Sequence, residues 1–91
     1  MSVQIRIPTQ LRSLTGGESE VTMEGATVGE ALRALDASHP GFSERIFDET
    51  GAVRRFVNVF ADDEDIRFLG GCETPLEGIK SLSIVPAVAG G

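Results

Sequence analysis

The strongest limit on the fold of this chain is a single amphipathic helix with strand-like segments on both sides of it in the sequence. Residues 28–35 space their apolar side chains at i, i+3, i+4 and i+7, the pattern of one helix face. Thr27 and Glu30 have the spacing of a capping box at its start, and His39-Pro40-Gly41 ends it. Because one helix covers only one face of a sheet, two layers are expected.

The strands are predicted from the alternation of apolar and polar residues. The expected strands cover residues 3–7, 20–24, 55–61, 66–69 and 81–85. The expected turns are Gly16-Gly17, the acidic run 62–65, Gly70-Gly71 and residues 76–78, and one short helical turn is expected over 43–47. The first two strands should pair as a hairpin. The residues expected to point inward on the last two long strands are Val57, Val59, Leu82 and Ile84.

The order of these elements is strand, strand, helix, strand, short strand, strand. A helix between two hairpin-like halves allows the first and last strands to meet in the centre of the sheet as a parallel pair. This predicts an α+β domain of the β-grasp type, a mixed sheet of four to five strands with one main helix on one face. Residues 1–86 would form this domain, and residues 87–91 a flexible C-terminal tail. Fully extended, five residues reach roughly 17 Å.

Charge and cysteine content argue against several functions. The chain has 91 residues, enough for one domain, and a net charge of −6, which disfavours binding to nucleic acid or to anionic membranes. A single cysteine, Cys72, cannot form an internal disulfide. The sequence has no metal-ligand spacing, Ser/His/Asp set or phosphate loop. With no signal-peptide pattern, a cytoplasmic protein is expected that is monomeric when free, binds no metal and is not an enzyme.

The sequence ends in Gly90-Gly91, and the terminal carboxylate is the main candidate for chemistry. Two glycines place no side chain near that carboxylate and adopt backbone angles that other residues avoid, so such an end can pass through a narrow channel. We therefore expect the tail to thread into a partner's active site, with Gly91 as the reacting residue; its members are Ala87, Val88, Ala89, Gly90 and Gly91. A frayed terminus without function is the alternative.

Five segments spread over the chain resemble the ThiS/MoaD family of ubiquitin-like sulfur carrier proteins, in particular its actinobacterial cysteine-biosynthesis branch. They are residues 7–17, 43–45, 56–60, 63–68 and 84–91. The resemblance implies that an adenylating enzyme of the ubiquitin-activating type joins AMP from ATP to the Gly91 carboxylate. A sulfur donor then replaces AMP and leaves a thiocarboxylate. ATP is thus used in trans, and the carrier itself binds no cofactor.

The resemblance also implies further partners. The sulfur acceptor would be a pyridoxal-phosphate cysteine synthase or a natural-product sulfur-transfer enzyme, and a zinc peptidase could trim the product from the tail. The alternatives are the MoaD-like small subunit of molybdopterin synthase, a modifier that forms isopeptide bonds with lysines, and a β-grasp binding module whose tail has no role. The sequence does not identify the acceptor.

The body of the domain offers a candidate partner-binding surface. Its members are Phe56, Asn58, Phe60, Arg54, Arg55 and Val85. If Val57 and Val59 face the helix, both phenylalanine rings lie on the opposite face, where exposed aromatic area marks binding sites. The alternative is that residues 40–55 fold over the rings as a second small core. Cys72 and His39 are interpreted as an incidental thiol and a helix-end residue, and the acidic run 62–65 as a solvated hairpin tip.

Overall fold

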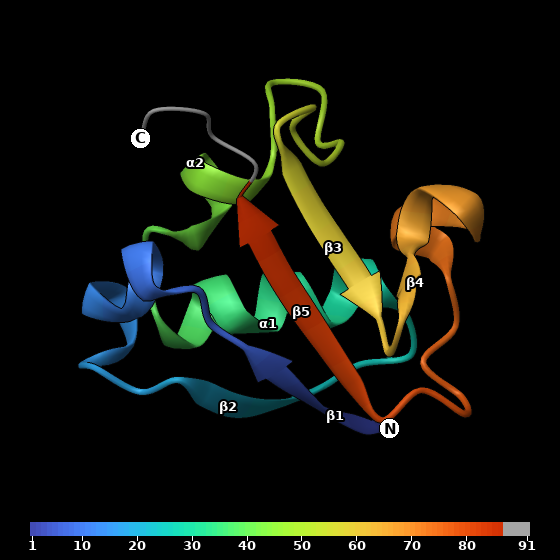
Figure 1. Ribbon diagram of the computed structural model, residues 1–91, viewed down its shortest axis with the longest axis horizontal. Helices are drawn as coiled ribbons and strands as arrows, with labels where there is room; N and C mark the ends of the chain where they lie inside the picture. Colours follow the sequence, from blue (N-terminus) through green and yellow to red (C-terminus); the bar gives the residue numbers. More distant parts are fainter. Residues whose placement is uncertain (87–91) are drawn as a thin grey trace.

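The fold is a five-stranded mixed sheet with its main helix packed on one face (Figure 1). The computed structural model describes residues 1–86. The strands are β1 (Ser2–Arg6), β2 (Glu20–Glu24), β3 (Val57–Ala61), β4 (Glu64–Asp65) and β5 (Ser81–Pro86). Their order in the sheet is β2-β1-β5-β3-β4. The β1–β5 pair is parallel and the others are antiparallel, so the predicted central parallel pair is confirmed.

The helical layer has one main element, as predicted. The helices are α1 (Val28–Ser38), α2 (Phe42–Ile46) and three 3-10 helices, η1 (Thr9–Thr15), η2 (Ile66–Phe68) and η3 (Gly71–Glu73). Figure 1 shows α1 crossing behind the sheet, with α2 near the end of β5 where the described chain stops. Within residues 1–86, no helix combines the length and the apolar character needed to span a bilayer.

The start of α1 confirms the capping signal with one difference. Thr27 Oγ1 accepts a hydrogen bond from the Glu30 backbone N–H (3.2 Å). The Glu30 side chain accepts from the N–H of Ala26 (3.0 Å), one residue before the cap, whereas a standard capping box returns to the cap residue itself. At the other end His39 is the C-cap, and its N–H donates to the Leu35 carbonyl (2.8 Å). The helix therefore ends where the sequence predicts.

The core lies between the sheet and α1. It comprises Val3 and Ile5 of β1, Val57, Val59 and Ala61 of β3, Leu82 and Ile84 of β5, the apolar stripe of α1 and the α2 residues Phe42 and Ile46. All four side chains predicted to point inward on β3 and β5 are buried. Burial of the α1 stripe against alternating strand positions is what stabilises the two-layer domain.

The predicted return strand over residues 66–69 is wrong. β4 is only two residues long and passes directly into η2. The Asp65 carboxylate caps this 3-10 helix by accepting from the Arg67 N–H (2.8 Å), and the turn buries Ile66 in the core. Periodicity misses this change because a single buried residue after a short strand fits both structures. β3 also begins two residues later than predicted, and η1 was not predicted.

Asp62 has a structural role that the solvated-tip interpretation missed. The turn between β3 and β4 is residues 62–63, and Asp62 has a φ of 56°, in the left-handed region. Its carboxylate accepts hydrogen bonds from the backbone N–H groups of Lys80 (3.2 Å) and Ser81 (3.1 Å). Asp62 thereby ties the hairpin turn to the first residue of β5, the central strand.

Candidate functional site

The candidate site is the end of β5, from which the predicted tail continues. Gly91 and the other predicted tail residues, Ala87, Val88, Ala89 and Gly90, lie outside the described residues. β1 pairs with β5 only as far as Ser83. The last three residues of β5 pair with β3, in the register Ile84↔Val59, Val85↔Asn58 and Pro86↔Val57. The base of the tail is therefore held in the sheet by the first half of β3.

Three of the predicted surface residues come together on the outer face of the sheet. Asn58 and Val85 are direct partners across β3 and β5, and Phe60 follows Asn58 on the same face of β3. Asn58 and Phe60 are half-buried, and Val85 is 43% exposed. We call these three residues the outer patch. It is small and partly apolar, and it lies beside the point where the described chain ends.

Phe56 lies in the connection directly before β3, outside the strand itself. The Val57 N–H donates to the Arg54 carbonyl (3.0 Å), so residues 54–57 form a turn. Phe56 is 51% exposed, so residues 40–55 do not cover it as a second core would. It borders a cavity of about 200 Å³ whose other lining residues include Leu11, Ile46 and Pro86. Phe56 thus adds apolar surface next to Pro86, two residues before Asn58 of the outer patch.

The two predicted arginines flank this end of the sheet. Arg54 Nε donates to the Glu44 carbonyl (3.2 Å), which directs part of its guanidinium toward α2, while Arg55 is exposed. Both residues precede β3, and β3 pairs its first residue with Pro86. The acidic residues 62–64 follow β3 at its other end. Arg55 therefore places one exposed positive charge at the end of the sheet where the tail begins, whereas Arg54 lies near the carboxylates of Glu44 and Asp48.

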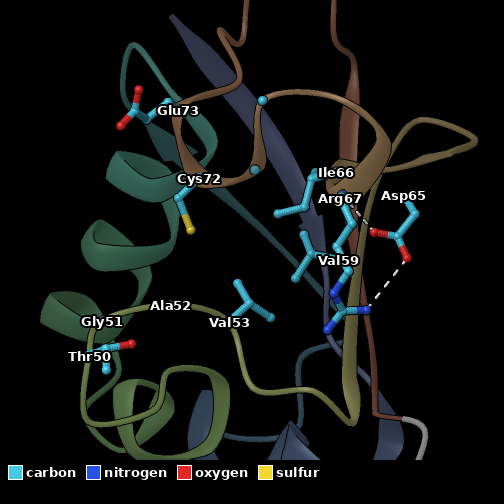
Figure 2. A pocket seen from close by; sticks show the side chains of 12 residues that line it. Thr50, Gly51, Ala52, Val53, Val59, Asp65, Ile66, Arg67, Cys72 and Glu73 are labelled. Atoms are coloured by element: carbon cyan, nitrogen blue, oxygen red, sulfur yellow. Dashed lines mark hydrogen bonds and ion pairs between the residues drawn. The ribbon is translucent and has the colours of Figure 1, made fainter.

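Arg67 is the residue of this region that the sequence analysis missed. Its Nη1 donates to Asn58 Oδ1 (2.6 Å), and its Nη2 donates to the carbonyls of Val57 (2.7 Å), Arg54 (2.8 Å) and Arg55 (3.3 Å). Asp65 Oδ2 lies 3.7 Å from Nη1. Figure 2 shows the Arg67 side chain beside β3, with both contacts to Asp65 drawn. No sequence motif reveals these contacts, because they depend on β4 being too short to pair with the first half of β3.

Cys72 lines a cavity of about 440 Å³ on the helix side of the sheet, together with residues 50–53 and Val59, Ile66 and Arg67 (Figure 2). Burial raises the pKa of the Cys72 thiol, and the charge of Arg33 offsets this in part. The protonated thiol is a poor nucleophile. Among residues 1–86, His, Cys, Asp and Glu side chains do not cluster in any group suited to a metal ion. The cavity lined by Cys72 therefore has neither an activated nucleophile nor a group of metal ligands among the described residues.

This architecture defines a ubiquitin-like β-grasp protein whose central strand ends beside a small outer patch. The ThiS family model matches residues 5–91. The chain is 45% identical to the "Sulfur carrier protein CysO" of Mycobacterium tuberculosis over the full length of both proteins. It is 32% identical to "Small archaeal modifier protein 3" of Haloferax volcanii, again over both full lengths. A solved structure of the Amycolatopsis orientalis BexX/CysO complex contains a chain with 45% identity and a TM-score of 0.89, covering 98% of this chain and 99% of that one.

The chain belongs to the ThiS family.

Proposed function

We propose that this protein is a sulfur carrier, activated at the Gly91 carboxylate and converted there to a thiocarboxylate. The observation that carries the proposal is the central strand β5, which ends at Pro86 beside an exposed patch and continues into the five residues 87–91. Full-length similarity to carriers named CysO supports it, as does a family match that includes the terminal glycines. The name CysO also favours cysteine synthesis as the pathway that receives the sulfur.

The proposed chemistry requires activation because a carboxylate resists attack by another anion. An adenylating enzyme would let the Gly91 carboxylate attack the α-phosphorus of ATP, forming an acyl-adenylate and releasing pyrophosphate. Hydrosulfide would then attack the acyl carbon and expel AMP, leaving a thiocarboxylate with no change in oxidation state. A side chain at position 90 or 91 would obstruct both displacements. ATP remains a substrate of the partner, and the carrier needs no cofactor of its own.

The partner must cover the surface around Pro86. Five extended residues reach roughly 17 Å, so an active site that holds Gly91 lies within that distance of the end of β5. The outer patch, Phe56 and the positive charge of Arg55 are therefore the surface that an adenylating enzyme or a sulfur acceptor would contact. A partner with an apolar surface and an acidic rim fits this end of the domain. We propose the same surface for a pyridoxal-phosphate cysteine synthase, a natural-product sulfur-transfer enzyme or a zinc peptidase.

The test is intact-mass measurement of the full chain after incubation with ATP, a candidate adenylating enzyme and sulfide. The expected result is the mass increase of an oxygen-for-sulfur exchange, located by fragmentation on the C-terminal peptide. A matched reaction with a chain lacking residues 90–91 should show no increase. Absence of any mass change with adenylating enzymes that act on related carriers would contradict the proposal.

One cysteine and no internal disulfide suit a reducing compartment, and we propose the cytoplasm.

A second candidate is a protein modifier, favoured by the full-length relative named as a small archaeal modifier protein. In that function a lysine amine, rather than hydrosulfide, would attack the acyl-adenylate and form an isopeptide bond. Higher-mass adducts on other proteins, lost when residues 90–91 are removed, would identify it. A carrier instead yields the thiocarboxylate without such adducts.

A further inference from the structure

We propose that Arg67 is a positioning residue that fixes the base of the tail, through β3, for docking of the partner that uses Gly91. The proposal rests on the carrier function proposed above. Arg67 lies on η2 and is separated in sequence both from the tail and from the outer patch. Its effect reaches the tail by the register of the sheet: Arg67 holds Val57 and Asn58, and these pair with Pro86 and Val85.

β4 is too short to cover the whole edge of β3. β4 pairs only with Phe60 and Ala61 of β3, so the first half of β3 has no strand neighbour on that side among the described residues. An unpaired strand edge leaves carbonyl groups without donors and allows the strand to fray. The Arg67 guanidinium occupies this edge and donates to the Val57 carbonyl at 2.7 Å. A side chain thus replaces the missing part of β4.

The guanidinium of Arg67 holds several acceptors at once. Nη2 carries two hydrogens, and its two short contacts go to the carbonyls of Val57 and Arg54, at 2.7 and 2.8 Å. These two carbonyls bracket the turn that carries Phe56. Nη1 holds the Asn58 side chain, which belongs to the outer patch. A planar fork of donors can bind these acceptors together, whereas the single ammonium of lysine cannot.

Asp65 sets the direction of the Arg67 side chain. Asp65 accepts from the Arg67 N–H through one carboxylate oxygen and lies 3.7 Å from Nη1 through the other. The same carboxylate therefore starts η2 and orients the guanidinium toward β3 (Figure 2). Because β1 leaves β5 at Ser83, the last three residues of β5 depend on this part of β3 for their strand pairing. Loosening the first half of β3 therefore changes the direction in which the chain leaves Pro86.

The variant that tests this is Arg67→Lys, with Arg33→Lys on the exposed side of α1 as the matched control. Both changes keep the charge, and Arg67 is solvent-exposed enough for the fold to persist. In the free protein, amide exchange at Val57 and Asn58 should be faster in Arg67→Lys and unchanged in Arg33→Lys. With the adenylating enzyme, the KM for the carrier should rise about tenfold while kcat stays constant, since only the fraction of docking-competent carrier falls.

A double-mutant cycle separates positioning from general stability. If Arg67 acts through Asn58 and the turn at Phe56, the KM effects of Arg67→Lys and Asn58→Ala should be less than additive. Unchanged amide exchange at Val57 and Asn58 in Arg67→Lys overturns the inference, whatever the enzyme does. If Arg67→Lys speeds amide exchange at Val57 and Asn58 but leaves the KM for the carrier unchanged, the docking role is overturned. Additive effects of Arg67→Lys and Asn58→Ala on KM overturn it as well. Wild-type carrier that is never adenylated would instead refute the proposed function, and exchange in the free protein would still test whether Arg67 holds β3.

Discussion

Substitution of Asp62 tests how the hairpin turn holds the central strand. Two contributions can be separated: a left-handed backbone at φ 56°, and two hydrogen bonds from the N–H groups of Lys80 and Ser81. Loss of hydrogen bonds at an exposed position costs about 1 kcal/mol in total. A β-carbon without a compensating side chain in the left-handed region costs about another 1 kcal/mol. Asp62→Ala should therefore lower the free energy of unfolding by about 2 kcal/mol.

The matched variants divide this total. Asp62→Gly removes the carboxylate but accepts the backbone angle, so a loss of about 1 kcal/mol is expected. Asp62→Asn keeps an acceptor and tolerates a left-handed φ, so it should stay within about 0.5 kcal/mol of wild type. The chain has no Trp or Tyr, so urea unfolding should be followed by far-UV circular dichroism. In thermal unfolding, Asp62→Ala should lower Tm by roughly 8–16 °C.

Two results would refute this reasoning about Asp62. Equal stability of Asp62→Ala and Asp62→Gly would show that the backbone angle carries no penalty. Wild-type stability of Asp62→Gly would show that the carboxylate does not stabilise the start of β5. Only the second result would return Asp62 to the solvated hairpin tip that the sequence predicted.

Four further predictions address the tail, the helices and the thiol. Gly90→Val should abolish thiocarboxylate formation while leaving the circular dichroism spectrum unchanged; normal conversion in the intact-mass assay would contradict the threading hypothesis. Hydrogen bonds from the backbone N–H groups of Ser43 and, to a smaller extent, Gly41 hold the pKa of the Asp36 carboxyl below its usual value. The ionised carboxylate therefore stabilises the fold fully above the unfolded pKa of about 3.9, and this contribution is lost as pH falls through the lower folded pKa. In Asp36→Asn the free energy of unfolding should consequently depend less on pH below about pH 4. Gly29→Ala places a β-carbon 3.0 Å from both the β-carbon and the carbonyl oxygen of Cys72 and should lower stability by about 1–3 kcal/mol in urea, although alanine favours helices. Because burial raises the pKa of Cys72, its alkylation by iodoacetamide at pH 8 should be slower than that of glutathione; an equal rate would contradict the placement of the thiol.

The fold could be predicted from the sequence because its main signals are local and agree with one another. The stripe and cap of α1 and the alternation of β3 and β5 each follow from residues close together in the chain. The central position of β5 followed from topology, since one helix between two strand pairs leaves few arrangements. The outward placement of Asn58 and Phe60 was predicted in the same way, from the alternation that buries Val57 and Val59.

The errors lie where a residue's role depends on a distant partner. Ile66 ends β4 because it can turn into the core. Asp62 and Arg67 act on backbone groups 18 and 10 residues away in sequence, respectively. Their side chains bind backbone groups that have no strand partner, and which groups lack one depends on the lengths of β4 and β5. Sequence periodicity does not show where those strands begin and end closely enough to reveal these contacts.

In the proposed carrier, partner recognition and the reaction would use different parts of the chain. The residues that a partner would contact are fixed on β3, β5 and the turn between residues 54 and 57, whereas the reacting carboxylate lies beyond Pro86. Changes in the outer patch should therefore alter the KM for the carrier, and changes at Gly90 should alter the rate of the bound complex. Arg67 belongs to the first group although it lies outside the patch, since it acts on the strand that presents the patch. A carrier used by several enzymes gains from this division, because each can contact the rigid end differently while handling the same small tail.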